Sequence, residues 1–276
     1  MRGASGGGWR MTGRERLERA FADLRSKGEG ALVAFVTAGD PSLERLPAVL
    51  EALETGGADV IEVGVPFSDP IADGPAIQAS SFRALQRGTT PVAILETLSR
   101  RRTETPIVLM GYWNTILRLG PREFAARAAE AGVCGTIVCD LIPEEMQEWF
   151  EASEEAGLAN VLLAAPTSDS SRLDRIAARS TGFLYAVSRT GVTGARDEVP
   201  EEARRLAAEL RARTDTPICV GFGVSRASHV REICSFADGA IVGSRLVEHL
   251  HRSQEETDWA SSLSALVAEL KAATQT

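Results

Sequence analysis

Residues 60–78 read VIEVGVPFSDPIADGPAIQ and form one complete strand–loop–helix unit. The unit begins with an apolar run that contains a single acid, Glu62, and ends where proline and isoleucine open a helical pattern. A loop of glycine, proline, serine and aspartate lies between them. A carboxylate in an apolar strand is costly to bury, and folding alone gives no reason for it. We therefore expect this unit to serve proton-transfer chemistry at the end of a buried strand.

The same alternation of apolar run and helical pattern continues along the whole chain. Runs that are apolar throughout are typical of parallel strands covered on both faces. Eight of them, with helices between, predict an α/β fold, a single (β/α)8 TIM barrel. An open doubly wound sheet is the weaker alternative, because no Gly-rich fingerprint follows the first run. The eight runs lie at residues 31–41, 59–63, 106–113, 135–140, 160–166, 182–188, 216–224 and 238–244.

The sequence contains two helical patterns in addition to those of the eight strand–helix units. An extra N-terminal helix is predicted over residues 12–27, where leucine and phenylalanine recur at helical spacing. An extra helix is predicted after strand 2, and the final helix is expected to break near residues 253–257. Residues 1–11 lack the apolar core of a signal peptide and are expected to be a flexible leader. Residues 12–276 are then one catalytic barrel domain.

The amino-acid composition limits which kinds of binding partner this chain can have. The chain has 276 residues and a net charge of −8 with no basic stripe, which argues against nucleic acid. No apolar run approaches a membrane span, so we expect no membrane partner and a cytoplasmic location. The four cysteines form no C-x-x-C pair, and the three histidines lie away from the motifs. We expect free thiols and no metal site.

Two acids of the opening unit are candidates for catalysis. Alternation along the strand directs Glu62 into the barrel interior near its top, where desolvation raises a carboxyl pKa. The alternative is an ion pair, but no strand carries an obvious inward base. Asp73 can orient a substrate N–H, or it can form an Asx-type turn or a helix cap before Pro75, and spacing leaves these interpretations open. Asp69 is expected to be structural.

Two further stretches have the residue types of ligand-binding loops. The loop SRTGVTGARDEV, residues 188–199, has the glycines and hydroxyls of a lid, although a solvated turn is the alternative. Strands ending in GFGV and GAIVGS place Gly223, Gly243 and Ser244 before helices. Backbone N–H groups there predict a phosphate cradle after the last two strands. Alternatively, these glycines only permit tight turns.

Six motifs of this chain occur in an order and spacing that resemble the α subunit family of tryptophan synthase. These motifs are FVTAGDP, IEVGVPFSDPIADGPAIQ, LIPEE, SRTGVTGAR, GFGVS and GAIVGS. The resemblance covers nearly the whole chain after the leader. It implies a retro-aldol cleavage of indole-3-glycerol phosphate to indole and glyceraldehyde 3-phosphate.

The resemblance also implies roles for individual residues. Glu62 matches the acid/base that protonates indole C3, and Asp73 matches the acid that binds the indole N–H and stabilises the ring charge. Thr193 matches a lid threonine that meets this aspartate. The remaining matches are the phosphate site, Gly194, Gly223, Gly243 and Ser244, and the pocket lining, Phe35, Tyr185 and Phe222. No cofactor is implied, since pyridoxal phosphate belongs to a separate β subunit.

By resemblance, the expected partner is a tryptophan synthase β subunit in an α2β2 complex. Gly111 and Thr115 depart from the family's usual residues in a loop expected to meet that subunit. Alternatives are a stand-alone lyase that releases free indole and a non-catalytic paralogue that activates a β partner. Other phosphate-binding barrels of the same pathway are disfavoured, because the Glu62 loop motif is not theirs.

Overall fold

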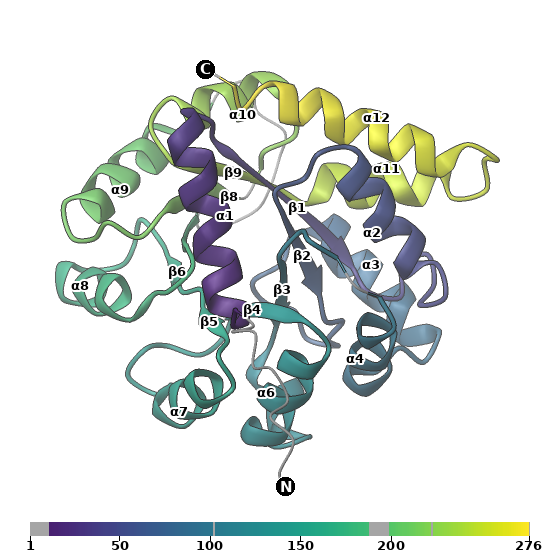
Figure 1. Cartoon of the computed structure of the whole chain (residues 1–276), viewed down its shortest axis with the longest axis horizontal. Helices are drawn as coiled ribbons and strands as arrows, with labels where there is room; N and C mark the ends of the chain where they lie inside the picture. The colour runs from purple at the N-terminus through teal and green to yellow at the C-terminus, as the bar shows by residue number, and fades with distance from the viewer. Residues whose placement is uncertain (1–10, 102, 188–198, 222, 276) are drawn as a thin grey trace, which may run out of the picture.

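The computed structural model describes residues 11–101, 103–187, 199–221 and 223–275. Its strands are β1 (Ala31–Thr37), β2 (Val60–Gly64), β3 (Ile107–Gly111), β4 (Val133–Val138), β5 (Ala159–Asn160), β6 (Leu163–Ala164), β7 (Leu184–Val187), β8 (Ile218–Gly221) and β9 (Gly239–Val242). Its helices are α1 (Gly13–Lys27), α2 (Leu46–Thr55), α3 (Pro75–Gln86), α4 (Pro91–Ser99), α5 (Trp113–Leu117), α6 (Pro121–Glu130), α7 (Gln147–Glu155), α8 (Ser170–Arg179), α9 (Glu201–Arg211), α10 (Ala227–Cys234), α11 (Ser244–Ser253) and α12 (Trp259–Ala272). Figure 1 shows the helices surrounding the strands.

The strands form a closed parallel ring. Their order is β5-β4-β3-β2-β1-β9-β8-β7-β6, so the first strand pairs with the last. The two ends of this order, β5 and β6, belong to one segment, residues 159–164, which pairs with β4 at its start and with β7 at its end. The fifth predicted strand is therefore split in two, and it joins the edges of the sheet. The predicted (β/α)8 barrel is confirmed.

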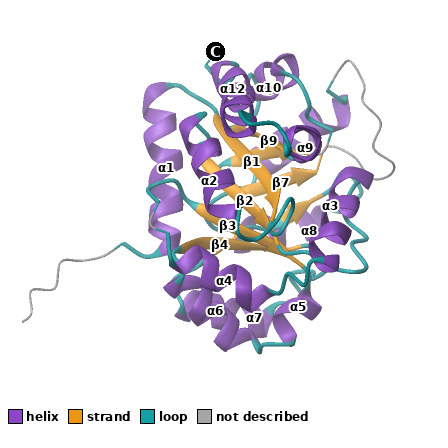
Figure 2. Ribbon diagram, turned by 90° about the vertical axis from the view of Figure 1, so that its right-hand side faces the viewer, coloured by secondary structure: helices purple, strands orange, loops and turns teal. Residues whose placement is uncertain are grey.

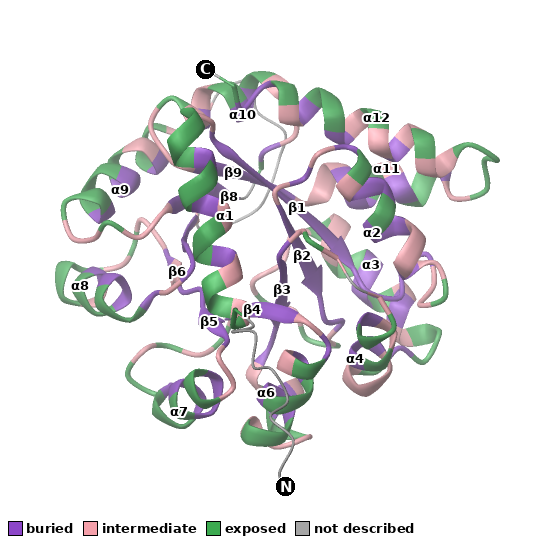
Figure 3. Ribbon diagram, in the orientation of Figure 1, coloured by how far each residue is buried: buried purple, intermediate pink, exposed green. Residues whose placement is uncertain are grey.

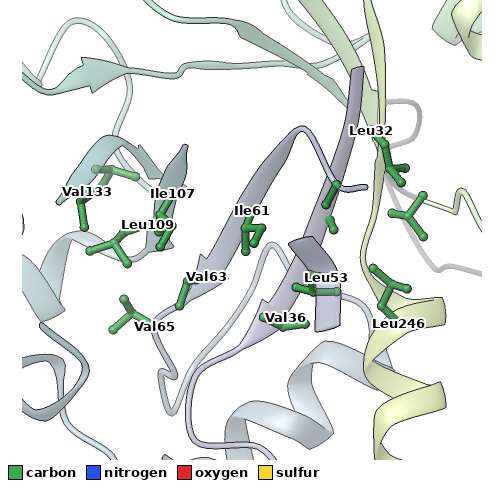
Figure 4. Close-up of a cluster of buried hydrophobic side chains, with 14 of the residues drawn as sticks. Leu32, Val36, Leu53, Ile61, Val63, Val65, Ile107, Leu109, Val133 and Leu246 are labelled. Atoms are coloured by element: carbon green, nitrogen blue, oxygen red, sulfur yellow. The ribbon is translucent and has the colours of Figure 1, made fainter. Parts of the chain in front are cut away.

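Alternation along the strands separates two layers of apolar side chains. An inner cluster fills the barrel and includes Val33, Phe35 and Val60. An outer cluster lies between strands and helices and includes Ile61 and Val63, part of which Figure 4 shows. Figure 3 shows the strands buried and the helices exposed on their outward faces. Because both faces of the sheet are covered, the continuous apolar runs of the sequence are explained.

Helix α1 is the predicted extra N-terminal helix, and it closes the N-terminal end of the barrel. Leu17, Phe21 and Leu24 join the inner cluster, and the rings of Phe21 and Phe183 lie 5.5 Å apart between centroids. The helix begins after Thr12 with a reciprocal capping box. Figure 2 shows α1 on the left and α3 on the right of the strands. The other end of the barrel is therefore left for the site.

Other predictions on the fold have mixed outcomes. Both α3 and α4 lie between β2 and β3, which confirms the extra helix after strand 2. The final helix is broken between Ser253 and Trp259, also as predicted, but the short α5 was not predicted. All four cysteines are free thiols. Among the described residues, no group of three or more metal-ligating side chains gathers, and no helix has the length and apolar character to span a bilayer. The predicted leader falls almost wholly outside the described residues.

Candidate active site

Glu62 lies inside the barrel, as its place in the sequence predicts. In the sheet it is paired with Phe35 of β1 and Val108 of β3, and it is 1 % exposed. Its Oε2 atom has no hydrogen-bond partner, and no salt bridge to it occurs within the described parts of the chain. Burial raises the pKa of Glu62 to about 8, and the charge of Asp73 adds to this effect. At neutral pH Glu62 is thus mostly protonated and can donate a proton.

Asp73 does not cap the helix that follows it. The N-cap of α3 is Gly74, which receives no side-chain cap, whereas Asp73 Oδ2 accepts a hydrogen bond from the Tyr112 hydroxyl at 3.0 Å. The capping alternative is therefore wrong. Burial raises the pKa of Asp73 to about 6, against the opposing effect of the Tyr112 hydrogen bond. Near neutral pH this carboxylate is largely ionised and can accept a hydrogen bond or stabilise a positive charge.

Tyr112 is a neighbour of Asp73 that sequence reasoning missed. Its hydroxyl donates to Asp73 and also accepts from the backbone N–H of Ala72 at 3.1 Å. Its ring stacks on Phe67 with centroids 4.9 Å apart. The signal in the sequence was only an aromatic residue directly after β3, at the C-terminal end of a strand. Asp69, in contrast, is exposed, and its Oδ2 atom accepts a hydrogen bond from the Ser68 hydroxyl at 2.5 Å.

One pocket at this end of the barrel brings most of the predicted residues together. It encloses about 460 Å³ between atoms, a volume that includes open solvent at its mouth. Its predicted lining residues are Phe35, Glu62, Asp73, Tyr185, Gly223, Gly243 and Ser244. Its unpredicted lining residues are Gly74, Ile77, Met110, Val224 and Ile241. The pocket therefore has a carboxylic end and a glycine-rich end.

The glycine-rich end has the features of an anion site. Gly243 is the N-cap of α11, and Ser244 is the first residue of that helix. Unpaired backbone N–H groups and the helix dipole favour a negative charge at such a position. Gly223 has a φ of +82°, which L side chains rarely adopt. A Cβ atom on Gly243 would lie 3.3 Å from Phe35 Cδ1, so glycine keeps the cradle open.

Three predicted residues cannot be placed. Thr193 and Gly194, with the proposed lid over residues 188–198, lie outside the described residues, as does Phe222. Their predicted roles therefore stay predictions.

Comparisons with known proteins agree with this geometry. A profile of the tryptophan synthase alpha chain family matches residues 21–275. The tryptophan synthase alpha chain of Geobacter sp. (strain M21) is 50% identical over 241 residues, which cover 87% of this chain and 90% of that relative. That of Geotalea daltonii is 46% identical over 259 residues, covering 93% and 98%.

Solved structures show the same similarity. A structure of Mycobacterium tuberculosis tryptophan synthase has a TM-score of 0.87 and 39% identity, and the match covers 95% of this chain and 98% of that one. The tryptophan synthase subunit alpha of Legionella pneumophila has a TM-score of 0.86 and 32% identity, with 96% and 99% covered. The chain therefore belongs to the tryptophan synthase alpha chain family.

Proposed function

We propose that this chain cleaves indole-3-glycerol phosphate to indole and glyceraldehyde 3-phosphate. The observation that carries the proposal is one pocket lined by two carboxyl groups, Glu62 and Asp73, and by the N-terminus of α11 at Gly243 and Ser244. Burial keeps Glu62 mostly protonated at neutral pH, whereas Asp73 is largely a carboxylate. A pair of titratable groups with separated pKa values is typical of an acid and a charge stabiliser acting together.

In the proposed reaction, protonated Glu62 gives its proton to indole C3. The ring then carries a positive charge shared with its nitrogen, and the carboxylate of Asp73 accepts the N–H and stabilises that charge. The Glu62 carboxylate next takes the proton of the side-chain hydroxyl next to the ring. The carbon–carbon bond breaks, its electron pair returns to the ring, and the hydroxyl carbon becomes an aldehyde. Glu62 is protonated again, so protons and electrons balance.

Tyr112 has a supporting role in this scheme. Its hydrogen bond occupies Asp73 Oδ2 and favours the ionised form of that carboxyl group. The other carboxylate oxygen is left for the substrate N–H. The second contact of Tyr112, with the N–H of Ala72, holds the loop that carries Asp73. Tyr112 therefore positions and tunes the charge stabiliser.

The phosphate group of the substrate is proposed to bind at Gly223, Gly243 and Ser244, where the N-terminus of α11 faces the pocket. Phe35 and Tyr185 line the space between the two ends and are proposed to contact the indole ring. We expect no cofactor for this reaction, because the protonated ring itself accepts the electron pair. Pyridoxal phosphate is expected only on a separate β subunit.

A tryptophan synthase β subunit is the proposed partner, in an α2β2 complex. Exposed apolar side chains follow three neighbouring strands: Ile71 after β2, Leu117 after β3 and Ile142 after β4. We call these three residues the apolar rim. We propose the rim, at the same end of the barrel as the pocket, as the surface that contacts the β subunit. The rim adjoins the site, because Tyr112 precedes the helix that carries Leu117.

Replacing Glu62 by glutamine tests the proposed function. Glu62→Gln keeps the shape but removes the proton donor, so indole release is expected to fall at least about 100-fold while substrate still binds. Indole release from indole-3-glycerol phosphate is measured with and without a β subunit, and binding is measured by calorimetry. Glu148→Gln, on the exposed face of α7, is the matched control. Wild-type turnover in Glu62→Gln would overturn the mechanism, and full turnover without a β subunit would favour a stand-alone lyase.

A further inference from the structure

A buried ion pair joins the loop after β1 to helix α3. Arg83 of α3 donates from Nε to Asp40 Oδ1 at 2.9 Å and from Nη2 to Asp40 Oδ2 at 2.5 Å. The Asp40 side chain is 5 % exposed and that of Arg83 is 22 % exposed. Two parallel hydrogen bonds fix the orientation of the partners as well as their distance. The pair therefore fixes how α3 lies against β1.

A second contact joins the same two elements closer to the site. The hydroxyl groups of Thr37 and Ser80 lie 2.6 Å apart, and both residues are buried. Ser80 Oγ donates to the carbonyl of Ile77 at 2.8 Å, so its one hydrogen is used and Thr37 is the donor between the two hydroxyls. Thr37 ends β1, and Ile77 lies in the first turn of α3. The strand therefore contacts the middle of the helix at Ser80, and Ser80 is bonded within the helix to its first turn.

Helix α3 carries one side of the pocket. Asp73 lies two residues before its first residue, Pro75, and Ile77 lines the pocket itself. Gln78 on the same helix donates from Nε2 to the backbone carbonyl of Asp73 at 2.9 Å and to that of Pro70 at 3.3 Å. A rotation or shift of α3 would therefore move Asp73 relative to Glu62, which is fixed in β2.

We propose that Asp40 and Arg83 form a positioning pair that holds α3 so that Asp73 faces the substrate. The inference rests on the proposed function, since it concerns the geometry of that reaction. A buried ion pair often stabilises a fold no more than apolar residues of the same volume would, so stability alone is a weak reason for this one. A displacement of about 1 Å at a reacting group, in contrast, can lower a rate about 100-fold.

The chain supplies a matched control pair. Arg101 donates two hydrogen bonds to Glu54 at 2.9 and 2.6 Å, and these side chains are 19 % and 22 % exposed. Glu54 lies in the last turn of α2, and Arg101 follows α4, so the pair lies near the starts of the next strands. That is the end of the barrel opposite the pocket. Arg101→Met therefore removes a similar ion pair without touching α3.

The experiment compares steady-state indole release and thermal unfolding of Arg83→Met, Arg83→Lys, Asp40→Asn and Arg101→Met. We expect Arg83→Met and Asp40→Asn to lower kcat about 10- to 100-fold with a smaller change in KM, because Asp73 acts mainly on the charge that develops during reaction. Arg83→Lys keeps the charge but not the bidentate geometry and should restore only part of kcat. Arg101→Met should lower Tm and leave kcat within about twofold.

Several results would overturn the inference. Wild-type kcat in Arg83→Met, or an equal loss of kcat in Arg101→Met, would show that the pair is only structural. If Arg83→Met does not fold, Arg83→Lys gives the second test, because lysine keeps the charge but cannot make both hydrogen bonds to Asp40. Wild-type kcat in Arg83→Lys would contradict the positioning role. A wild-type chain that releases no indole would instead overturn the proposed function, and this inference with it.

Discussion

Substituting Glu62 should change the stability of the fold as well as its activity, in a way that depends on pH. The Glu62 carboxyl group is buried without a hydrogen bond to Oε2, so the folded chain holds its proton up to a pKa of about 8 instead of the ordinary 4.5. Between these two values the folded chain binds more protons than the unfolded chain. The free energy of unfolding must therefore fall as pH rises through this range.

The size of the effect follows from the pKa values. Each pKa unit corresponds to about 1.4 kcal/mol, so this group costs the wild-type fold about 1 kcal/mol at pH 5 and about 4 kcal/mol at pH 8. Glutamine at position 62 has no such titration, although its buried amide adds an offset that does not vary with pH. The difference in unfolding free energy, Glu62→Gln minus wild type, should thus grow by about 3 kcal/mol from pH 5 to pH 8 in favour of the variant.

Chemical denaturation of both proteins at pH 5, 6, 7 and 8 measures this difference. The two proteins share all their other titratable groups, so the contribution of those groups cancels in the difference between the two unfolding free energies. Glu148→Gln is the control, because it also replaces one glutamate by glutamine, but at an exposed position. Parallel curves for wild type and Glu62→Gln would refute the reasoning, because they would mean that Glu62 titrates alike in the folded and unfolded chains.

Three further substitutions test the rest of the pocket. Tyr112→Phe removes the hydrogen bond that lowers the pKa of Asp73, and the pKa of Asp73 should therefore rise above about 6. As a result, the acid limb of the pH profile of kcat/KM should move to higher pH. Gly221→Ala places a methyl group 2.7 Å from ring atoms of Tyr185, which must move, and kcat/KM should fall about 10-fold in the indole-release assay. Gly243→Val crowds the anion cradle, so KM should rise about 10-fold with little change in kcat, and inhibition by inorganic phosphate should weaken in parallel.

The sequence predicted the parts of the fold and site that depend on local patterns. Continuous apolar runs gave the strands, and the period of two placed Glu62 inside the barrel. The glycines at the ends of the last two strands led us to predict an anion cradle; Gly243 is the N-cap of α11, and anion binding there stays a prediction.

The rest depends on contacts between distant residues. Asp73 was equally compatible with a helix cap, and the residue that decides the matter, Tyr112, is 39 positions away. The split of the fifth strand was not visible in an apolar run, since the split follows from pairing with β4 on one side and β7 on the other. The five-residue α5 is too short to show a helical period.

The pairing of the first strand with the last has a consequence for the growing polypeptide on the ribosome. β1 is made early, but the neighbour on one of its edges, β9, is among the last segments translated. Until then one row of backbone donors and acceptors on β1 is open to other chains. Gly243 and Ser244 follow β9 directly, so these two residues of the proposed anion cradle enter the pocket in the same step that covers this edge. A nascent chain that has not reached β9 therefore lacks both the partner for this edge of β1 and the helix N-terminus that lines the pocket.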